Sequence, residues 1–557
     1  MSWRSVPQRL CSAVFLCAGL ICFGVPQVHA QGGEPLTFAI QGAKVVPVSS
    51  APLENATVLV SDGRITAVGA DVKVPPDAWV IDGKGLVVYP GLIDGFTDVG
   101  IAPAAQSGSD AAPKQQPVSR GPEDRPASTP WRNAADEVNP ADPRVETWRM
   151  AGFTTVVAAP KSGMFPGQAA VLNLGGERPG NFVVKTPVAI PVSLQAPGGF
   201  RNYPGSLMGA VAYVRQVWLD TNWDAEAHAT YAKNPRGTSR PGHDRTDAAL
   251  AEALSKNAVV LLPGNNSLQI RRALRLDEEW KLNGVIYGGQ MAYEVAPEIA
   301  VKKVPVLVDL KWPEAPKDAD PEGVPSLREL RFRDRAPSSP AALAKSGVRF
   351  AFYSGGITAP KDILPAVKKA IDAGLAPDAA LRALTLSPAE IFGVSETLGS
   401  IEKGKIANLT VADGDLFDKK TKIKFVFVDG RKYEVHEVLR PSEPPKGDLS
   451  GKWKLKFTTQ QGEEEATADL TMESDGTLTG SVKSDRGTGS VFSGWVSGEK
   501  FTFTINLEIE GGPTDVTFSG TFEGSSMKGS ISTLGYTFDF TGSKPSRSMS
   551  AMAGGAR

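Results

Sequence analysis

Cysteine and histidine are scarce in this chain, and their scarcity limits the chemistry it can perform. Of its 557 residues, three are cysteine and four are histidine. The cysteines are Cys11, Cys17 and Cys22, all within the first 30 residues. If that segment is removed, the remaining chain can form neither a disulfide bond nor a thiolate metal site, and it has no cysteine nucleophile.

An excess of charge and long apolar runs are absent as well. The chain has 60 basic and 61 acidic residues, for a formal net charge of -1. Without a large basic field, a nucleic-acid partner is not expected. After the N-terminus no apolar run is long enough to span a bilayer, so no transmembrane span is expected in the mature chain. The oligomeric state is not readable from these features.

The N-terminus has the pattern of a secretion signal. Arg4 and Arg9 precede an apolar stretch, residues 10–25, and Val28-His29-Ala30 has the small-residue spacing of a cleavage site. We therefore expect residues 1–30 to be a signal peptide, and the protein to be exported to the periplasm or the extracellular space. A membrane anchor is the alternative, which the shortness of the apolar run disfavours.

The length of the chain predicts two or three domains. Residues 31–88 contain short strands separated by turn residues, and residues 396–440 return to strands. Between them, residues 89–395 alternate apolar runs with amphipathic helices, which predicts parallel βα units and a (β/α)₈ TIM-like barrel. The predicted fold class is therefore multidomain, with a barrel inserted into a small composite β-sandwich and followed by another all-β domain.

Smaller segments have their own patterns. Residues 102–143 are rich in Ala, Pro, Ser and Asp, which predicts a flexible insertion. Residues 441–448 read as a linker and residues 546–557 as a disordered tail. In residues 449–545 strands recur about every ten residues, which predicts an all-β barrel or sandwich.

This last domain opens with Gly451-Lys452-Trp453, which resembles the start of a lipocalin-like barrel. Such a resemblance would imply ligand or surface binding. The simpler interpretation is a core tryptophan that packs under one end of a barrel.

Several motifs within residues 38–435 resemble the metal-dependent amidohydrolase superfamily. Residues 88–94 are similar to the strand that opens its barrel, and residues 152–156 and 167–171 resemble the subgroup related to imidazolonepropionase. Near the end of the barrel, residues 380–389 and 398–405 are a close match. The resemblance implies a barrel with a metal at the C-terminal ends of its strands, where the ion activates water for attack on a carbon–nitrogen bond.

The first ligand motif that this resemblance implies is altered. In the family the first barrel strand ends in Asp-x-His-x-His, whereas this chain reads Asp94-Gly95-Phe96-Thr97-Asp98. Phe96 has no lone pair to offer a metal, while Asp98 retains oxygen donors. Asp98 is therefore the candidate metal ligand.

The other ligand positions are altered too. The histidines implied for the fifth and sixth strands fall near Pro263 and Gly288, and Gly355 stands where the family has an aspartate after the eighth strand. Histidines elsewhere cannot replace them, because His29 leaves with the signal peptide. The other three histidines are expected in surface or structural roles: His228, His243 and His436.

Carboxylates offer an alternative metal site. Asp94, Asp98 and Asp309 could share the mouth of the barrel, and oxygen ligands suit Mg²⁺ or Ca²⁺ better than a hydrolytic Zn²⁺. The simpler interpretation is that Asp94 closes a backbone turn and Asp309 ends its strand.

Neutral polar residues near the predicted strand ends could line a binding pocket for a small molecule. These candidate substrate-binding residues are Asn265, Asn266, Tyr287, Gln290 and Tyr353.

Two functions remain open. The first is an exported amidohydrolase-superfamily relative, catalytically inactive or strongly altered, that binds a small molecule or an envelope component and needs no cofactor. The alternative is an active hydrolase of non-peptide, cyclic amide-like carbon–nitrogen bonds, with an atypical divalent metal site around Asp98.

Overall fold

The computed structural model describes residues 37–101, 125, 127–195, 204–315, 324–435 and 443–544, apart from short gaps at 460–461, 474–475, 486, 510–511 and 534–535. The chain divides into two compact units, Met1–Val435 and His436–Arg557. The predicted signal peptide and the predicted C-terminal tail lie outside the described residues.

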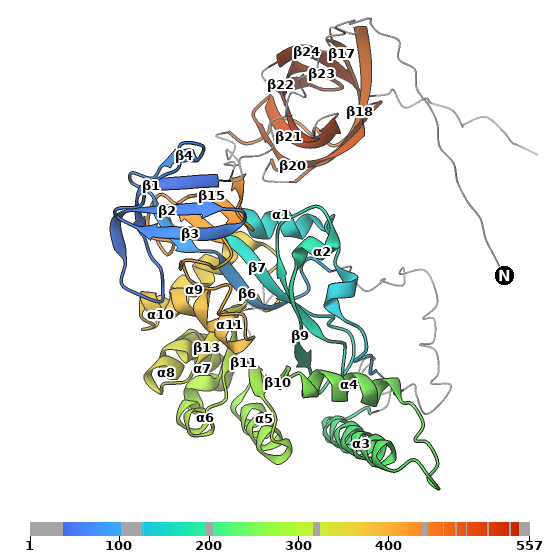
Figure 1. The fold of residues 1–557 in the computed structure, drawn as a ribbon. Coiled ribbons are helices and arrows are strands. Elements are labelled where there is room, and N and C mark those ends of the chain that lie inside the picture. Colours follow the sequence, from blue (N-terminus) through green and yellow to red (C-terminus); the bar gives the residue numbers. More distant parts are fainter. Residues whose placement is uncertain are drawn as a thin grey trace, which may run out of the picture. The chain divides into compact units, whose positions relative to one another are not determined.

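The segments before and after the barrel contribute to one mixed sheet, seen in blue and orange in Figure 1. Its strands follow the order β16-β15-β14-β5-β1-β2-β3, with β4 paired to β1. They are β1 (Thr37–Val45), β2 (Leu53–Ser61), β3 (Arg64–Gly69), β4 (Trp79–Asp82), β5 (Val87–Pro90), β14 (Leu409–Ala412), β15 (Ile423–Val428) and β16 (Arg431–Glu434). Pairing of β14 with β5 joins the two segments. The two-layered sandwich itself stays a prediction.

Eight further strands form the barrel of the first unit, in the order β13-β12-β11-β10-β9-β8-β7-β6. They are β6 (Leu92–Thr97), β7 (Phe153–Ala158), β8 (Ala169–Asn173), β9 (Val183–Pro191), β10 (Val259–Gly264), β11 (Gly284–Gly288), β12 (Val306–Asp309) and β13 (Phe350–Tyr353). The first and last strands lie side by side, since the backbone N–H of Ser354 donates to Asp94 Oδ1 at 3.0 Å. The predicted TIM-like barrel is thereby confirmed.

The prediction of parallel βα units throughout the barrel is wrong for one strand. β8 runs antiparallel to both β7 and β9. Chain length explains this, because a parallel crossover needs roughly a dozen residues or more. The connections on either side of β8, residues 159–168 and 174–182, are too short for a helical crossover.

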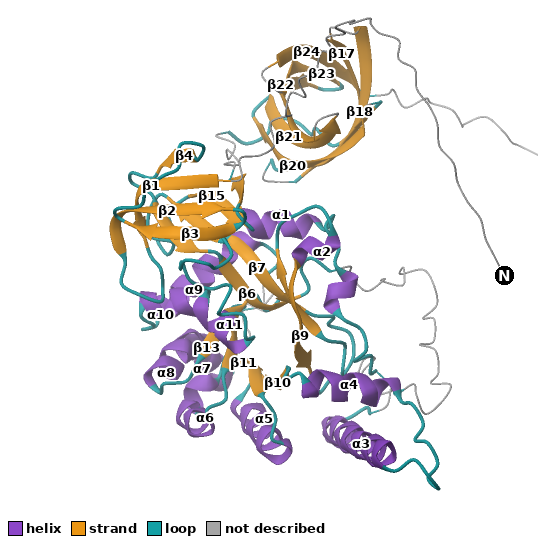
Figure 2. Cartoon of the chain, viewed as in Figure 1, coloured by secondary structure: helices purple, strands orange, loops and turns teal. Residues whose placement is uncertain are grey.

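Helices cover the outside of the barrel, and Figure 2 shows α5, α6 and α8 beside the strands labelled β10, β11 and β13. In α5, the residues Ile270, Ala273 and Leu274 are buried, a spacing that places one apolar stripe against the strands. The helices are η1 (Ala134–Glu137), α1 (Pro143–Met150), α2 (Pro179–Phe182), α3 (Leu207–Lys233), α4 (Arg245–Ser255), α5 (Ser267–Trp280), η3 (Ala292–Glu294), α6 (Ala296–Lys302), α7 (Leu327–Arg335), η4 (Ala336–Ser338), α8 (Ser339–Lys345), η5 (Pro360–Asp362), α9 (Ile363–Asp372), α10 (Pro377–Ala383) and α11 (Leu386–Ile391). Among the described residues, none of the helices has the length and apolar character needed to cross a membrane.

The predicted flexible insertion, residues 102–143, is partly built into the barrel wall. Residues 102–124 and 126 lie outside the described part of the chain. Ser128 and Ala134 are buried, and the Ser128 hydroxyl lies 2.9 Å from the hydroxyl of Tyr213 in α3. Isolated bridges also join Ser128 to Phe165 and Asn133 to Gln168. Tertiary contacts, which composition does not encode, hold residues 127–143 in place.

A buried polar junction connects the barrel to the mixed sheet. The side chain of Asn408 donates to Thr155 Oγ1 and Asn173 Oδ1 and accepts from the backbone N–H of Asp429. Asn173 in turn donates to Asp429 Oδ1 at 2.7 Å. Because buried polar groups are costly when unpaired, this network fixes how the inserted barrel meets its sheet.

The second unit is a closed antiparallel barrel in which each strand pairs with the next and β17 pairs with β24. Its strands are β17 (Gly451–Thr459), β18 (Gly462–Met472), β19 (Leu478–Ser484), β20 (Gly487–Ser497), β21 (Lys500–Ile509), β22 (Gly512–Glu523), β23 (Ser526–Thr533) and β24 (Tyr536–Ser543). Its core includes fully buried Trp453, whose Nε1–H donates to the carbonyl oxygen of Leu449 at 2.8 Å. The predicted all-β barrel is confirmed, and its likeness to lipocalins stays a prediction.

Candidate functional site at the barrel mouth

Three aromatic side chains meet where strands of the barrel end. Phe96 comes from β6, Tyr287 from β11 and Tyr353 from β13. The ring centroid of Phe96 lies 5.3 Å from that of Tyr287 and 5.8 Å from that of Tyr353. We call these three residues the aromatic cluster. Tilted ring pairs of this kind stabilise a structure by more than their burial alone. Phe96 and Tyr353 are buried, so the cluster occupies space inside the barrel at the strand ends.

Asp309, the last residue of β12, borders the aromatic cluster. Its Oδ2 lies 3.5 Å from the Tyr353 hydroxyl, and its Oδ1 accepts from the backbone N–H of Lys311 at 2.7 Å. Burial raises the pKa of Asp309 to about 7, although both of these donors act to lower it. Burial and the neighbouring Asp309 also raise the pKa of Tyr353 well above its usual value. The mouth therefore contains a carboxyl group that exchanges its proton near neutral pH.

Gly355 makes room for the carboxyl group of Asp309. Its φ is +61°, in the left-handed region that favours glycine, and a β-carbon added there would overlap the Asp309 side chain. The position where the resemblance implied an aspartate thus adjoins a carboxyl group that comes from a different strand.

Two of the predicted binding residues use their polar side-chain groups to bind backbone carbonyl oxygens of the protein itself. The hydroxyl of Tyr287 donates to the carbonyl oxygen of Val192 at 3.0 Å. The side-chain amide of Gln290 donates to the carbonyl oxygens of Asp309, at 3.3 Å, and Lys311, at 2.6 Å. Gln290 therefore fixes the loop that follows β12.

The remaining predicted binding residues, Asn265 and Asn266, lie at the start of α5. The Asn266 side chain accepts from the backbone N–H of Gln269 at 3.0 Å and so caps the helix. Asn266 also lines a cavity of about 630 Å³ formed by the start of α5, the segment around η3, and α7. Of the five predicted residues, two belong to the aromatic cluster, Gln290 holds the loop after β12 and Asn266 lines this outer cavity, while the side chain of Asn265 lies beside Gly288.

Asp98, the predicted metal ligand, is engaged by two cations. Lys161 Nζ lies 2.8 Å from its Oδ1, and Arg144 Nη1 lies 3.3 Å from its Oδ2. Burial acts to raise the pKa of Asp98, but Lys161 and Arg144 outweigh it and lower that pKa. The Asp98 carboxylate is therefore held ionised and already balanced by charge.

Asp94 makes different contacts from those of Asp98. The Oδ1 of Asp94 accepts from the backbone N–H groups of Phe96 and Ser354, and its Oδ2 accepts from Trp148 Nε1 at 3.2 Å. Burial raises its pKa although these hydrogen bonds act to lower it. Asp94 closes the turn as expected and, in addition, ties β6 to β13 and to α1.

The donor set at the mouth does not fit a histidine-bound metal ion. Phe96, Pro263, Gly288 and Gly355 have no side-chain lone pair that could bind a metal. In the part of the chain that the structure describes, no group of three or more His, Cys, Asp or Glu side chains is arranged to hold one.

The described histidines lie on helices or loops. The Nδ1 of His228, in α3, is 3.0 Å from the carbonyl oxygen of Asp224, one helical turn earlier. His243 is exposed and precedes α4. His436 lies outside the described residues.

Sequence reasoning missed the basic residues around the mouth. Nothing in their spacing links Arg144 and Lys161 to Asp98, because the three meet only through the register of β6, β7 and α1. The arginines of α7 did have a signal, since Arg328, Arg331 and Arg335 repeat at helical spacing and so share one helix face.

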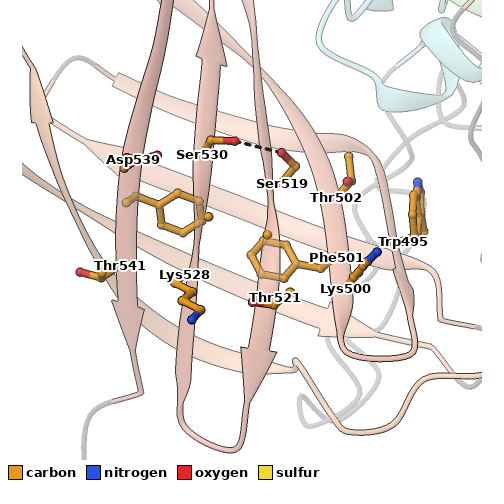
Figure 3. Close-up of a pocket in the computed structure, with 13 residues that line it drawn as sticks. Trp495, Lys500, Phe501, Thr502, Ser519, Thr521, Lys528, Ser530, Asp539 and Thr541 are labelled. Carbon is orange, nitrogen blue, oxygen red and sulfur yellow. Dashed lines mark hydrogen bonds between the residues drawn. The ribbon is translucent and has the colours of Figure 1, made fainter.

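The second unit has a cavity of its own, of about 730 Å³. Figure 3 shows Trp495 and Lys500 at one side and Asp539 and Thr541 at the other, with the hydroxyls of Ser519 and Ser530 hydrogen-bonded between them. The cavity therefore combines hydroxyl, charged and aromatic groups on the wall of the β-barrel.

Comparison with known proteins shows which family part of this chain is similar to. Residues 246–439 match the model of the amidohydrolase family. An amidohydrolase of known structure from Thermotoga maritima MSB8 superimposes with a TM-score of 0.59 and 26% sequence identity, over 71% of this chain and 100% of that one. Part of the chain is thus similar to the amidohydrolase family, in agreement with the resemblance of the motifs.

Two other similar proteins are more distant or match over a short stretch. A dihydroorotase from Geotalea daltonii is 47% identical over 55 residues, which cover 10% of this chain and 13% of the dihydroorotase. A prolidase of known structure, complexed with N-methylphosphonate-L-proline, has 18% identity and a TM-score of 0.45 over 72% of this chain and 99% of its own.

Proposed function

We propose that this amidohydrolase-family relative is an exported binding protein, in which the barrel mouth holds a small molecule or an envelope component and does not perform metal-dependent hydrolysis. Within the family we assign it to the imidazolonepropionase-related subgroup, on the motifs in residues 152–156 and 167–171.

The aromatic cluster is the observation that carries this proposal. Phe96 takes the position of a family ligand, and its ring packs against Tyr287 and Tyr353. A metal ion there would need nitrogen or oxygen donors about 2 Å away, and a phenyl ring offers none. The buried rings therefore leave this position without the donors that metal-dependent hydrolysis needs.

The chemistry of Asp98 supports the same proposal. To bind a metal ion, Asp98 would have to give up its contacts with Lys161 and Arg144. The described residues provide too few other donor atoms to hold that ion. The two cationic neighbours of Asp98 would also repel a divalent ion.

A second candidate function is favoured by Asp309. A carboxyl group with a pKa of about 7 is suited to act as a general acid or base near neutral pH. The alternative is therefore a hydrolase of non-peptide carbon–nitrogen bonds with an atypical site that includes Asp98 or Asp309.

Metal content and turnover separate the two candidates. The purified mature protein is dialysed against Zn²⁺ and Mn²⁺, analysed for bound metal, and assayed with cyclic amides and dipeptides. We expect neither stoichiometric metal nor turnover. Stoichiometric metal with turnover, both lost in Asp98→Ala and both kept in the exposed control Asp71→Ala, would overturn the binding proposal.

Turnover without metal would overturn it as well. In that case Asp309→Asn should abolish the reaction, while Asp71→Asn should leave it unchanged. Export is tested separately, by N-terminal sequencing of the protein from cell fractions. We expect the chain to begin near residue 31 outside the cytoplasm, and an uncleaved cytoplasmic chain would contradict that part of the proposal.

A further inference from the structure

A cationic cavity lies at the outer edge of the barrel mouth. It has a volume of about 630 Å³, and three separate elements line it: the start of α5, the segment around η3, and α7. All three follow the C-terminal ends of barrel strands, the end at which such barrels bind their ligands. We call this space the rim cavity.

Positive charge predominates among the described residues that line the rim cavity. Among the described residues that line it, Arg328, Arg331 and Arg335 come from α7 and Glu294 is the one acidic residue. None of the three arginines forms an ion pair with another residue in the part of the chain described here. The chain as a whole has a net charge of -1, so this local excess of positive charge is not a general property of its surface.

Helix geometry separates the positive charges. With a rise of about 1.5 Å per residue, the backbone positions of Arg328 and Arg335 are about 10 Å apart along α7. One carboxylate pairs bidentately with one guanidinium, so the two ends of the row offer places for two separate negative groups. The row therefore suits a ligand with two negative groups held apart.

Apolar side chains lie beside the arginines. Leu268 in α5 is 68% exposed and Leu327 in α7 is 62% exposed, and both line the cavity together with Met291 and Tyr293. The exposed leucines thus give the cavity an apolar wall beside its arginines. The start of α5 adds the partial positive charge of a helix N-terminus to the same space.

We propose that the rim cavity binds a small organic dianion whose two negative groups are joined by an apolar chain. The arginines at the ends of the row hold the two negative groups, and the leucines contact the chain between them. This inference rests on the proposed function, in that it takes ligand binding as the role of the mouth, and it names the chemical class of the ligand.

The test uses octanedioate, which has a carboxylate at each end of a six-methylene chain, with the mature protein in calorimetric titrations. We expect saturable binding that weakens as salt is added. Butanedioate, which is too short to span the row, and the uncharged 1,8-octanediol should bind at least ten-fold more weakly. Absence of octanedioate binding, or equal binding of the diol, would overturn the proposal.

Variants locate the site. Arg328→Ala and Arg335→Ala should each weaken octanedioate binding by at least ten-fold. Arg275→Ala removes another exposed arginine, in α5 but not among the residues that line the cavity, and should leave binding unchanged. Because all three arginines are exposed, circular dichroism should show no loss of folded protein. Equal losses in all three variants would indicate a general charge effect and contradict the proposal.

Failure of this inference is distinguishable from failure of the proposed function. If the protein proves to be a hydrolase, the metal and turnover assays reveal it whether or not octanedioate binds. If those assays are negative and octanedioate does not bind, the ligand class is wrong while the binding proposal stands.

Discussion

Asp309 and Gly355 share one space at the mouth of the barrel: a β-carbon on Gly355 would overlap the carboxyl group of Asp309. The two residues belong to neighbouring parts of the barrel, since β12 pairs with β13 and Gly355 follows β13. The position where the family resemblance implied an aspartate is thus small because a carboxyl group from β12 already lies against it.

Substitution of Gly355 by alanine should destabilise the first unit. The left-handed φ of +61° disfavours any side chain, at a cost of about 1–3 kcal/mol, and the overlap with Asp309 adds to it. Gly347 is a matched control, because its φ is +71° while a β-carbon there meets no atom within 4 Å. In urea unfolding, Gly355→Ala should therefore lower the free energy of unfolding more than Gly347→Ala does.

A double-mutant cycle tests the overlap directly. Asp309→Ala removes the atoms that clash, so Gly355→Ala should cost less in that background, whereas Gly347→Ala should cost the same in both. Equal costs of Gly355→Ala in the two backgrounds would show that strain at φ alone explains its effect.

Asp309 should make the first unit less stable as pH rises. Its pKa rises from an ordinary 3.8 to about 7 in the folded protein, so between these values the folded state binds more protons than the unfolded state. This contribution is complete below pH 4 and is lost as pH rises to 7, with a slope of at most about 1.4 kcal/mol per pH unit.

Urea unfolding at several pH values between 4.5 and 7.5 measures this dependence. In Asp309→Asn the free energy of unfolding should fall less steeply with pH than in the wild type, since the other buried carboxyl groups are common to both proteins. Asp71→Asn, at an exposed position, should keep the wild-type slope. A slope that Asp309→Asn leaves unchanged would show that Asp309 does not titrate in this range.

Trp453 should control the stability of the second unit alone. Its side chain is fully buried in the closed barrel, and truncation of a buried tryptophan to alanine costs about 3–5 kcal/mol. Calorimetry of Trp453→Ala should show the melting transition of this unit at a lower temperature and that of the first unit unmoved. Trp453→Phe should have a smaller effect, because it mainly loses the hydrogen bond to Leu449. An equal shift of both transitions would contradict the division into two units.

Much of the fold could be predicted from the sequence because its signals are local. The apolar runs that became β10 and β12 are buried on both sides, which makes them recognisable as barrel strands. The antiparallel course of β8 was missed, although the short connections on both of its sides carried the necessary information. The packing of residues 127–143 could not be predicted, because it depends on contacts such as that of Ser128 with Tyr213, 85 residues apart.

The candidate site was only partly predictable for the same reason. Tyr287 and Tyr353 were identified as residues of the mouth, but Gln290 was expected to face a ligand and instead binds the backbone around Asp309. An amide side chain can bind a ligand only if no neighbouring carbonyl group already takes its hydrogen bonds. Which carbonyl groups lie nearby cannot be predicted from a sequence pattern.

The sequence by itself determined which side chains this protein can use. Phe96, Pro263, Gly288 and Gly355 offer no metal donor wherever they lie, because the donor atoms are absent from the residues themselves. Only the tertiary structure decided how the remaining groups are used. It gave Asp98 two cationic partners, raised the pKa of Asp309 by burial, and placed the arginines of α7 in one cavity with the start of α5 and the segment around η3. Each of these depends on distances between residues far apart in the chain, and the pairing of strands and packing of helices set those distances.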